Sequence, residues 1–271
     1  MPTIDLRGKP IAITGASSGI GRATALACAK AGMPVVVGAR RVDLLQALVS
    51  EIRAAGGQAE AVACDVDKPE DGERLTARTI EAFGSIYSVF ANAGFGLEGA
   101  VADLTMEQWD AIIRTNFYGT LHTISPALKA MRAAGSGHIL ICSSCVSKVG
   151  LPFHSAYSAT KAMQDHVGRA LRLELEGSGI HVSTLLPIGV STEFSARVAE
   201  RAGGKRTAVR TPDSMKQTPQ FVASRVLDSL RKPVGEIWTH LPTRLAMGVL
   251  TMMPGIGDWY LARRLKKQRA H

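Results

Sequence analysis

The chain of 271 residues has 46% hydrophobic and 20% charged residues, a composition that excludes a disordered or repetitive protein. Its net charge is +9, from 32 Lys and Arg against 23 Asp and Glu, which would suit an anionic partner. The basic residues are dispersed and do not alternate with aromatic ones, so we expect no nucleic-acid partner.

Residues 1–5 lack the basic and then apolar order of a signal peptide. No uncharged apolar run reaches the ~18 residues that span a bilayer. We therefore expect a cytoplasmic protein with reduced thiols. Cys142 and Cys145 form a C-x-x-C pair, but no second pair exists for a zinc site, and no metal is expected. Packing at a buried strand end is favoured over a redox role for this pair.

Short apolar runs alternate with amphipathic stretches, which is typical of βαβ units. Strands are expected at residues 10–14, 34–37, 59–64, 86–91, 138–142, 180–186 and 236–240. Helices are expected at residues 20–31, 42–55, 69–83, 105–133, 155–176 and 221–230. These elements predict a single-domain α/β fold, a Rossmann-like doubly wound parallel sheet with helices on both faces.

Two segments fall outside this alternation. Residues 189–218 are rich in Gly, Ser, Thr, Arg and Lys, and they predict a long binding loop without regular structure. Residues 241–271 are apolar, carry Trp and Tyr, and end in basic residues.

A glycine-rich turn, Thr-Gly-Ala-Ser-Ser-Gly-Ile-Gly at residues 14–21, joins the first expected strand to the first expected helix. Glycines at such a turn let a pyrophosphate approach backbone N–H groups at the helix N-terminus. An ordinary βα turn is the alternative. The context predicts dinucleotide binding by Gly15, Ser17, Ser18, Gly19, Ile20 and Gly21.

The end of the second expected strand selects the nucleotide. An acidic residue there would hydrogen-bond the ribose 2′-hydroxyl of NAD. This chain instead has Arg40 and Arg41, and its first acid, Asp43, falls inside the next helix. Because guanidinium groups match a 2′-phosphate, the sequence predicts NADP(H) as cofactor.

Tyr157 and Lys161 are four residues apart in the helix expected at 155–176, so they share one face. An ammonium beside a phenol favours the phenolate and lowers a pKa that is ordinarily about 10. We therefore expect Tyr157 to donate and accept a proton near neutral pH.

Several features in one order make the chain resemble the short-chain dehydrogenase/reductase family over about residues 8–195. They are the glycine-rich turn, Asn92-Ala93-Gly94, Asn116, Ser144 placed 13 residues before Tyr157, and the Tyr157–Lys161 pair. The resemblance implies a catalytic domain over residues 1–240, with a substrate loop at about 189–218. Residues 241–271 would be a C-terminal extension of the same domain.

The resemblance also implies roles for single residues. Tyr157 would exchange a proton with the substrate oxygen, and Lys161 would hold the nicotinamide ribose. Ser144 would hydrogen-bond the carbonyl or alkoxide. Asn116 would fix the local helix geometry and a water leading toward Lys161. Further cofactor contacts are implied for Asp65 (adenine), Val66, Asn92, Ala93, Gly94, Pro187 and Thr192 (nicotinamide amide).

Each of these residues also has a simpler interpretation. Ser144 and its neighbour Ser143 would cap the following turn. Asn116 would be a satisfied polar residue inside a helix, and Asp65 a turn residue. The order and spacing of the whole set favour the functional interpretation.

The activity implied is that of an NADP(H)-dependent oxidoreductase that interconverts a ketone and a secondary alcohol, as a homodimer or homotetramer. Apolar residues at 151–153 and in the tail predict a bulky lipophilic substrate, or else a subunit interface. A 3-oxoacyl thioester is the alternative substrate, because its anionic carrier would suit Arg197, Arg201, Lys205, Arg206 and Arg210.

Two further alternatives remain open. A non-catalytic NADP(H)-binding regulatory protein is the alternative from another functional class. Trp259 and Tyr260, followed by a basic end, also predict peripheral contact with an anionic membrane surface. The sequence leaves the substrate and the physiological direction of the reaction open.

Overall fold

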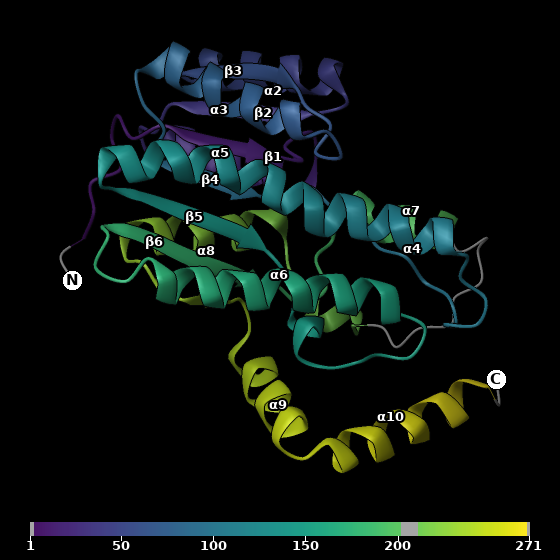
Figure 1. Cartoon of the computed structure of the whole chain (residues 1–271). Helices are drawn as coiled ribbons and strands as arrows, with labels where there is room; N and C mark the ends of the chain where they lie inside the picture. The colour runs from purple at the N-terminus through teal and green to yellow at the C-terminus, as the bar shows by residue number, and fades with distance from the viewer. Residues whose placement is uncertain (1–2, 202–210, 270–271) are drawn as a thin grey trace.

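A single parallel sheet organises the part of the chain that the computed structural model describes, residues 3–201 and 211–269, apart from the side chains of residues 199, 201, 264 and 267–269. Its strands are β1 (Ile11–Thr14), β2 (Val35–Ala39), β3 (Ala59–Ala63), β4 (Ser88–Ala91), β5 (Gly137–Cys142), β6 (Ile180–Leu186) and β7 (Glu236–Trp238). They lie in the order β3-β2-β1-β4-β5-β6-β7 (Figure 1). The doubly wound α/β fold expected from the sequence is confirmed.

Helices cover both faces of the sheet because alternate strand residues point to opposite sides. Ile11, Ile13 and Val35 pack on one side against α1 (Gly19–Lys30), α2 (Val42–Ala54) and α8 (Pro219–Arg231). Ala12 and Val36 pack on the other side. There the sheet is covered by α3 (Pro69–Phe83), α5 (Gly119–Ala134) and α6 (Ser155–Glu174).

The strand order reverses at β1, which pairs with β2 on one side and with β4 on the other. In a doubly wound sheet such a switch point opens a crevice at the carboxyl ends of the strands. The glycine-rich turn after β1, Asn92 after β4 and Ser144 after β5 are all placed at this edge.

The long helical region expected at residues 105–133 is confirmed, and a wide turn within it was not expected. The structure has α4 (Met106–Ile113), a π-helical turn η1 (Arg114–Tyr118) and then α5. Asn116 lies in the middle of that turn and is fully buried. Its side-chain amide accepts from Phe95 N and donates to Phe95 O, both at 2.9 Å, and these bonds to a neighbouring segment fix the wide turn.

The prediction of a long irregular loop at residues 189–218 is wrong in part, because the segment includes regular structure. It contains the helix α7 (Glu193–Arg201) and a short 3-10 turn η3 (Asp213–Met215). Thr192 Oγ1 accepts from Phe194 N at 3.3 Å before α7 begins. Phe194 and Val198, four residues apart, pack on the backbone near Gly96.

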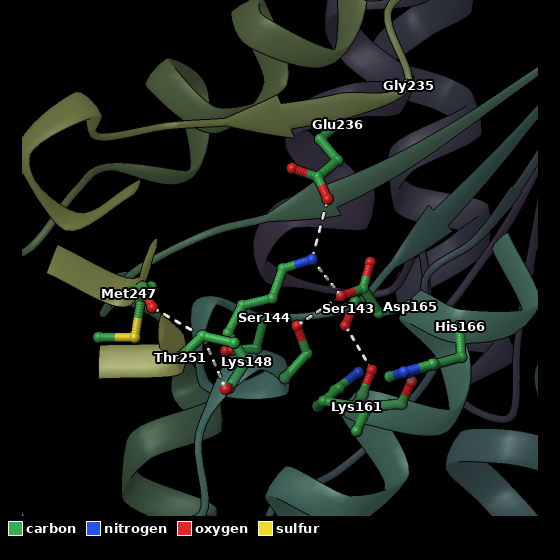
Figure 2. A network of polar contacts seen from close by, with 12 residues as sticks. Ser143, Ser144, Lys148, Lys161, Asp165, His166, Gly235, Glu236, Met247 and Thr251 are labelled. Carbon is green, nitrogen blue, oxygen red and sulfur yellow. Dashed lines mark hydrogen bonds and ion pairs between the residues drawn. The ribbon is translucent and has the colours of Figure 1, made fainter. Parts of the chain in front are cut away.

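Residues 241–271, for which the sequence predicted no helices, form α9 (Leu241–Met252) and α10 (Pro254–Arg269), which project away from the sheet (Figure 1). Thr251 Oγ1 donates to Lys148 O at 3.3 Å, where η2 (Cys145–Lys148) follows β5. Lys148 Nζ also forms ion pairs with Asp165 of α6 at 2.7 Å and with Glu236 of β7 at 2.8 Å (Figure 2). The residue that α9 contacts is therefore itself bound to two elements of the α/β domain. Among the described helices, none is long and apolar enough to cross a bilayer.

Candidate active site

The glycine-rich turn presents backbone N–H groups in the crevice. Gly15 has φ +66°, and a side chain there would meet Ala93 Cα at 2.8 Å. Gly21 lies against Asn92, whose Nδ2 would be 2.6 Å from an added Cβ. The N-cap residue of α1, Ser18, makes no side-chain capping bond, and the first turn holds no acidic residue. The N–H groups of Gly19, Ile20 and Gly21, at this helix N-terminus, are therefore suited to accepting an anion.

Arg41 lies over this turn. Its Nη2 donates to Ser17 Oγ and Ser18 Oγ, both at 3.0 Å, and its Nη1 pairs with Glu193 of α7 at 3.2 Å. The structure thus brings one of the two expected arginines to the anion site. Arg40, at the end of β2, is exposed to solvent.

Other expected cofactor residues lie close to the glycine-rich turn or to Lys161. Asn92 Nδ2 donates to Thr14 O at 3.0 Å, which ties β4 to the start of the turn. Gly94 lies close to both Asn116 Oδ1 and Lys161 Nζ. Ala93 backs the glycine turn, as described above, and Thr192 lies beside Gly19.

Asp65 and Val66 follow β3, and Pro187 follows β6. Asp65 Oδ1 accepts from Asp67 N at 3.3 Å, so it has the turn-residue role as well. Val66 and Pro187 are buried, and Pro187 O accepts from Cys145 N at 3.1 Å. These residues stay predicted cofactor contacts, now placed at the same edge of the sheet.

Ser144 and Tyr157 meet above the end of β5. Ser144 Oγ accepts from Val146 N at 3.4 Å, so the residue does cap η2 as the simpler interpretation holds. Burial raises the pKa of the Tyr157 phenol, and the nearby Ser144 hydroxyl opposes that shift. Ser143 Oγ donates to Lys161 O at 2.7 Å and fastens α6 to the strand end (Figure 2). Ser144 therefore faces the candidate site, whereas Ser143 holds α6 in place.

The structure contradicts the expectation that Lys161 lowers the pKa of Tyr157. Burial dominates and raises the pKa of Tyr157 well above its ordinary value. Lys161 Nζ donates instead to Cys142 O at 2.7 Å and to Gln164 Oε1 at 2.8 Å, and lies 5.6 Å from the centre of the Tyr157 ring. Burial lowers the pKa of Lys161.

Aromatic and apolar side chains surround the phenol. The His154 ring meets Tyr157 edge-on at 6.3 Å, and the Phe194 ring lies 5.7 Å away on α7. Phe153 adopts φ +62°, a strained backbone conformation for a residue with a side chain. The segment before α6 and the helix α7 therefore flank the Tyr157 phenol.

Cys142 and Cys145 are buried free thiols, as are the other two cysteines. Burial raises the pKa of Cys145 to about 11 and also raises that of Cys142. Both thiols are therefore inert at neutral pH, as packing residues would be.

Sequence reasoning missed Gln164, Glu193 and Phe194. Gln164 is fully buried and contacts Lys161, Asn116 and Thr120. Its position three residues after Lys161 in the same helix was the available signal. Glu193 and Phe194 could have been identified only if α7 had been predicted. The available signal was the apolar pair Phe194 and Val198, spaced i, i+4. Of the arginines and lysine expected in the substrate loop, Lys205, Arg206, Arg210 and the side chain of Arg201 lie outside the described residues.

Comparison with known proteins agrees with this geometry. Residues 9–203 match the short chain dehydrogenase family. An uncharacterized oxidoreductase of Listeria monocytogenes is 35% identical over 233 residues, covering 84% of this chain and 92% of its own length. The dehydrogenase/reductase SDR family member 7B of Bos taurus is 29% identical and covers 97% of this chain and 83% of its own length.

Solved structures show the same fold. A short chain dehydrogenase/reductase of Burkholderia phymatum in complex with NAD superposes with a TM-score of 0.84 at 24% identity, covering 94% of this chain and 96% of its own. An alcohol dehydrogenase of Thermococcus sibiricus complexed with 5-hydroxy-NADP gives a TM-score of 0.74 at 30% identity, covering 85% and 95% of the two chains.

Proposed function

This chain belongs to the short-chain dehydrogenase/reductase family, and we propose that it is an NADP(H)-dependent oxidoreductase that interconverts a ketone and a secondary alcohol. The observation that carries the proposal is the meeting of Ser144, Tyr157 and Lys161 beside Gly94, next to an open anion site. Hydroxyl donors placed around one point stabilise the negative charge that develops on a carbonyl oxygen during its reduction.

The crevice fits a phosphorylated dinucleotide. The N-terminus of α1 offers free N–H groups and no acidic residue, and Arg41 supplies a guanidinium beside Ser17 and Ser18. Gly15 and Gly21 leave no room for side chains where the chain approaches Asn92 and Ala93. NADPH would supply the hydride, and the protein positions the substrate and supplies the proton.

Tyr157 is suited to the role of proton donor. Because burial raises its pKa, the phenol keeps its proton throughout the neutral range. In ketone reduction the hydroxyl hydrogen moves to the substrate oxygen, while Ser144 hydrogen-bonds that oxygen.

The environment of Tyr157 favours a bulky lipophilic substrate. His154 and Phe194 flank the phenol, and Leu97 is buried close by in an apolar cluster with Ile112. A 3-oxoacyl thioester stays the alternative substrate, with Arg197 as the one described side chain of its proposed carrier contact. That arginine already pairs with Glu193 at 2.7 Å. The alternative of a non-catalytic, NADP(H)-binding regulatory protein is disfavoured, because Ser144, Tyr157 and Lys161 are all present.

A panel of carbonyl compounds tests this proposal. We expect NADPH oxidation with bulky apolar ketones, and at least about tenfold lower kcat/KM with small polyol-derived ketones, since the latter lack apolar surface to bury. A 3-oxoacyl thioester as the preferred substrate would support the alternative. Activity on small sugars alone would contradict the lipophilic assignment, and cofactor binding without turnover on any compound would favour the regulatory alternative.

We further propose a homodimer or homotetramer in a cytoplasmic setting, in keeping with the family. Light scattering on the purified full chain would measure the assembly directly.

A further inference from the structure

The side-chain amide of Gln164 lies fully buried between Lys161 and the π-helical turn η1. Its Oε1 accepts from Lys161 Nζ at 2.8 Å, and its Nε2 donates to Asn116 O at 2.7 Å and to Thr120 Oγ1 at 2.6 Å. An ammonium can only donate and a backbone carbonyl can only accept, so the amide has a single satisfactory orientation. Gln164 therefore links Lys161 rigidly to Asn116.

This link joins the two residues between which the family resemblance implied a water. The resemblance to the family implied a water held by Asn116 and leading toward Lys161. In the structure, Asn116 O accepts from Thr120 Oγ1 at 2.7 Å and from Gln164 Nε2. A carbonyl oxygen has two lone pairs, and protein groups use both. An amide neither gains nor loses a proton near neutral pH, so it cannot relay one.

We propose that Gln164 is a positioning residue for proton transfer, which holds Lys161 beside Tyr157 as a charged ammonium and closes a proton path through Asn116. The inference rests on the proposed role of Tyr157 as proton donor. Lys161 is a buried cation whose Nζ donates to Cys142 O and Gln164 Oε1. Loss of one acceptor would disfavour its charged form.

Few other ionisable groups face this ammonium. Tyr157 lies on the same helix, Cys142 lies on β5, and Cys145 of η2 faces Tyr157. Both thiols stay protonated because burial raises their pKa. From the side of η1 and α5, the contacting groups are the neutral Asn116 and Thr120. The apparent pKa at the alkaline limb of a kcat/KM profile therefore belongs to the coupled Tyr157–Lys161 pair and not to either residue alone.

The test compares the pH profiles of kcat/KM for ketone reduction in Gln164→Leu and Gln164→Glu. Leu removes the acceptor, so the alkaline limb should move down by about one pH unit, with an about tenfold loss of kcat/KM. Glu adds a negative charge beside the ammonium, so the limb should move up by a similar amount. Thr123→Val is the matched control, because Thr123 is a buried hydroxyl of α5 that donates to Gly119 O and does not touch Lys161.

Opposite shifts in the two variants, with the control unchanged, would support the inference. Unshifted profiles, or shifts of both variants in the same direction, would overturn it. A residue with only a structural role would lower kcat/KM without moving the alkaline limbs of the two variants in opposite directions. Thermal unfolding and NADPH affinity by fluorescence identify any variant that fails to fold. If Tyr157→Phe keeps full activity, the proposed function itself fails, which is a distinct result.

The first tail helix, α9, has an exposed apolar stripe that is separate from the candidate active site. Leu241, Leu245, Val249 and Met252 follow one face of α9 and are 62%, 65%, 51% and 85% exposed. Thr243, on the other side of the helix, is buried. Trp259 and Tyr260 of α10 are also exposed. An apolar surface of this extent marks an interaction site.

The charge of the tail identifies the kind of partner. Residues 241–271 contain six Lys or Arg and one acidic residue, Asp258. The Arg263 guanidinium lies 5.5 Å from the Trp259 ring, so cationic and aromatic groups share one stretch of α10. Tryptophan and tyrosine with nearby cations are typical of helices that lie in the interface of an anionic bilayer.

We infer that α9 and α10 rest on an anionic membrane surface, with the stripe of α9 in the acyl boundary and the cations of α10 at the headgroups. The surface lies on helices that project from the body (Figure 1).

Sedimentation of the full chain with vesicles tests this inference. We expect binding to phosphatidylcholine vesicles that contain phosphatidylserine, at least about tenfold weaker binding without phosphatidylserine, and weakening by salt. Leu245→Ser/Val249→Ser should reduce the binding about tenfold or more. Val101→Ser/Met106→Ser, which changes exposed apolar residues near α4, is the matched control and should bind as the wild type does.

Three results would overturn it: equal binding to uncharged vesicles, binding unaffected by the stripe variant, or no binding to either vesicle. If the stripe variant instead converts a dimer into monomers by light scattering, the surface binds a second copy of this chain. A shift of Trp259 emission to shorter wavelength on mixing with phosphatidylserine vesicles would be an independent supporting result.

Discussion

Tyr157→Phe should lower kcat for ketone reduction by about 10²–10⁴-fold, because it removes the proton donor and one hydrogen bond to the developing oxyanion. The change keeps the aromatic ring between His154 and Phe194, so packing should be retained. Stopped-time assays of NADPH oxidation measure the loss, and fluorescence titration should show an NADPH dissociation constant close to that of the wild type.

Tyr87→Phe is the matched control for this change. Tyr87 is a partly buried tyrosine just before β4, and its ring packs under Lys9 at 4.4 Å, away from the crevice. It should keep wild-type turnover. A Tyr157→Phe enzyme that retains more than about a tenth of the wild-type kcat would show that another group supplies the proton.

The pH dependence follows from the same residue. Reduction requires the protonated phenol, and burial raises the pKa of Tyr157. The reduction rate should therefore stay level from acidic through neutral pH and fall only at alkaline pH, where the phenol loses its proton.

Arg41→Ala should raise the NADPH dissociation constant about ten- to hundredfold and leave NADH nearly unchanged. The guanidinium would form charge-assisted hydrogen bonds to the 2′-phosphate, each contributing about 1.5–3 kcal/mol. Its position above Ser17 and Ser18 supports this contact more directly than the exposed position of Arg40 does. Adding Arg40→Ala to the Arg41 variant should weaken NADPH binding further if both arginines reach the phosphate.

Arg53→Ala is the control for this second prediction, since Arg53 pairs with Glu60 at the far end of α2. It should bind both cofactors as the wild type does. Equal losses for NADPH and NADH in the Arg41 variant would mean that this arginine supports the turn rather than the phosphate, and the NADP(H) preference would lose its structural basis.

The fold and the grouping of the candidate catalytic residues could be predicted from the sequence because both leave local signals. Buried strands such as Val35–Ala39 are uninterrupted apolar runs, and the helices between them end at glycines. The glycine turn, Asn116, Ser144, Tyr157 and Lys161 are recognised by order and spacing, and the structure gathers them at one edge of the sheet.

The remaining features depend on contacts between segments that are distant in the chain. The π-helical turn is fixed by bonds between Asn116 and Phe95, and Gln164 gains its partners only when α6 packs on η1. The raised pKa of Tyr157 is a consequence of its burial, which spacing along one helix does not reveal. The tail helices were missed because their exposed stripe has no core to face within the described chain.

Transfer of deuterium from NADPH to the product tests the central claim most directly. NADPH carrying deuterium at either face of nicotinamide C4 is mixed with enzyme and a bulky apolar ketone, and the alcohol is analysed by mass spectrometry. We expect one deuterium on the carbinol carbon from one of the two labelled cofactors. Tyr157→Phe should transfer it at a rate lower by about 10²-fold or more than the wild type. NADPH oxidation that leaves no deuterium in the product from either label would contradict it.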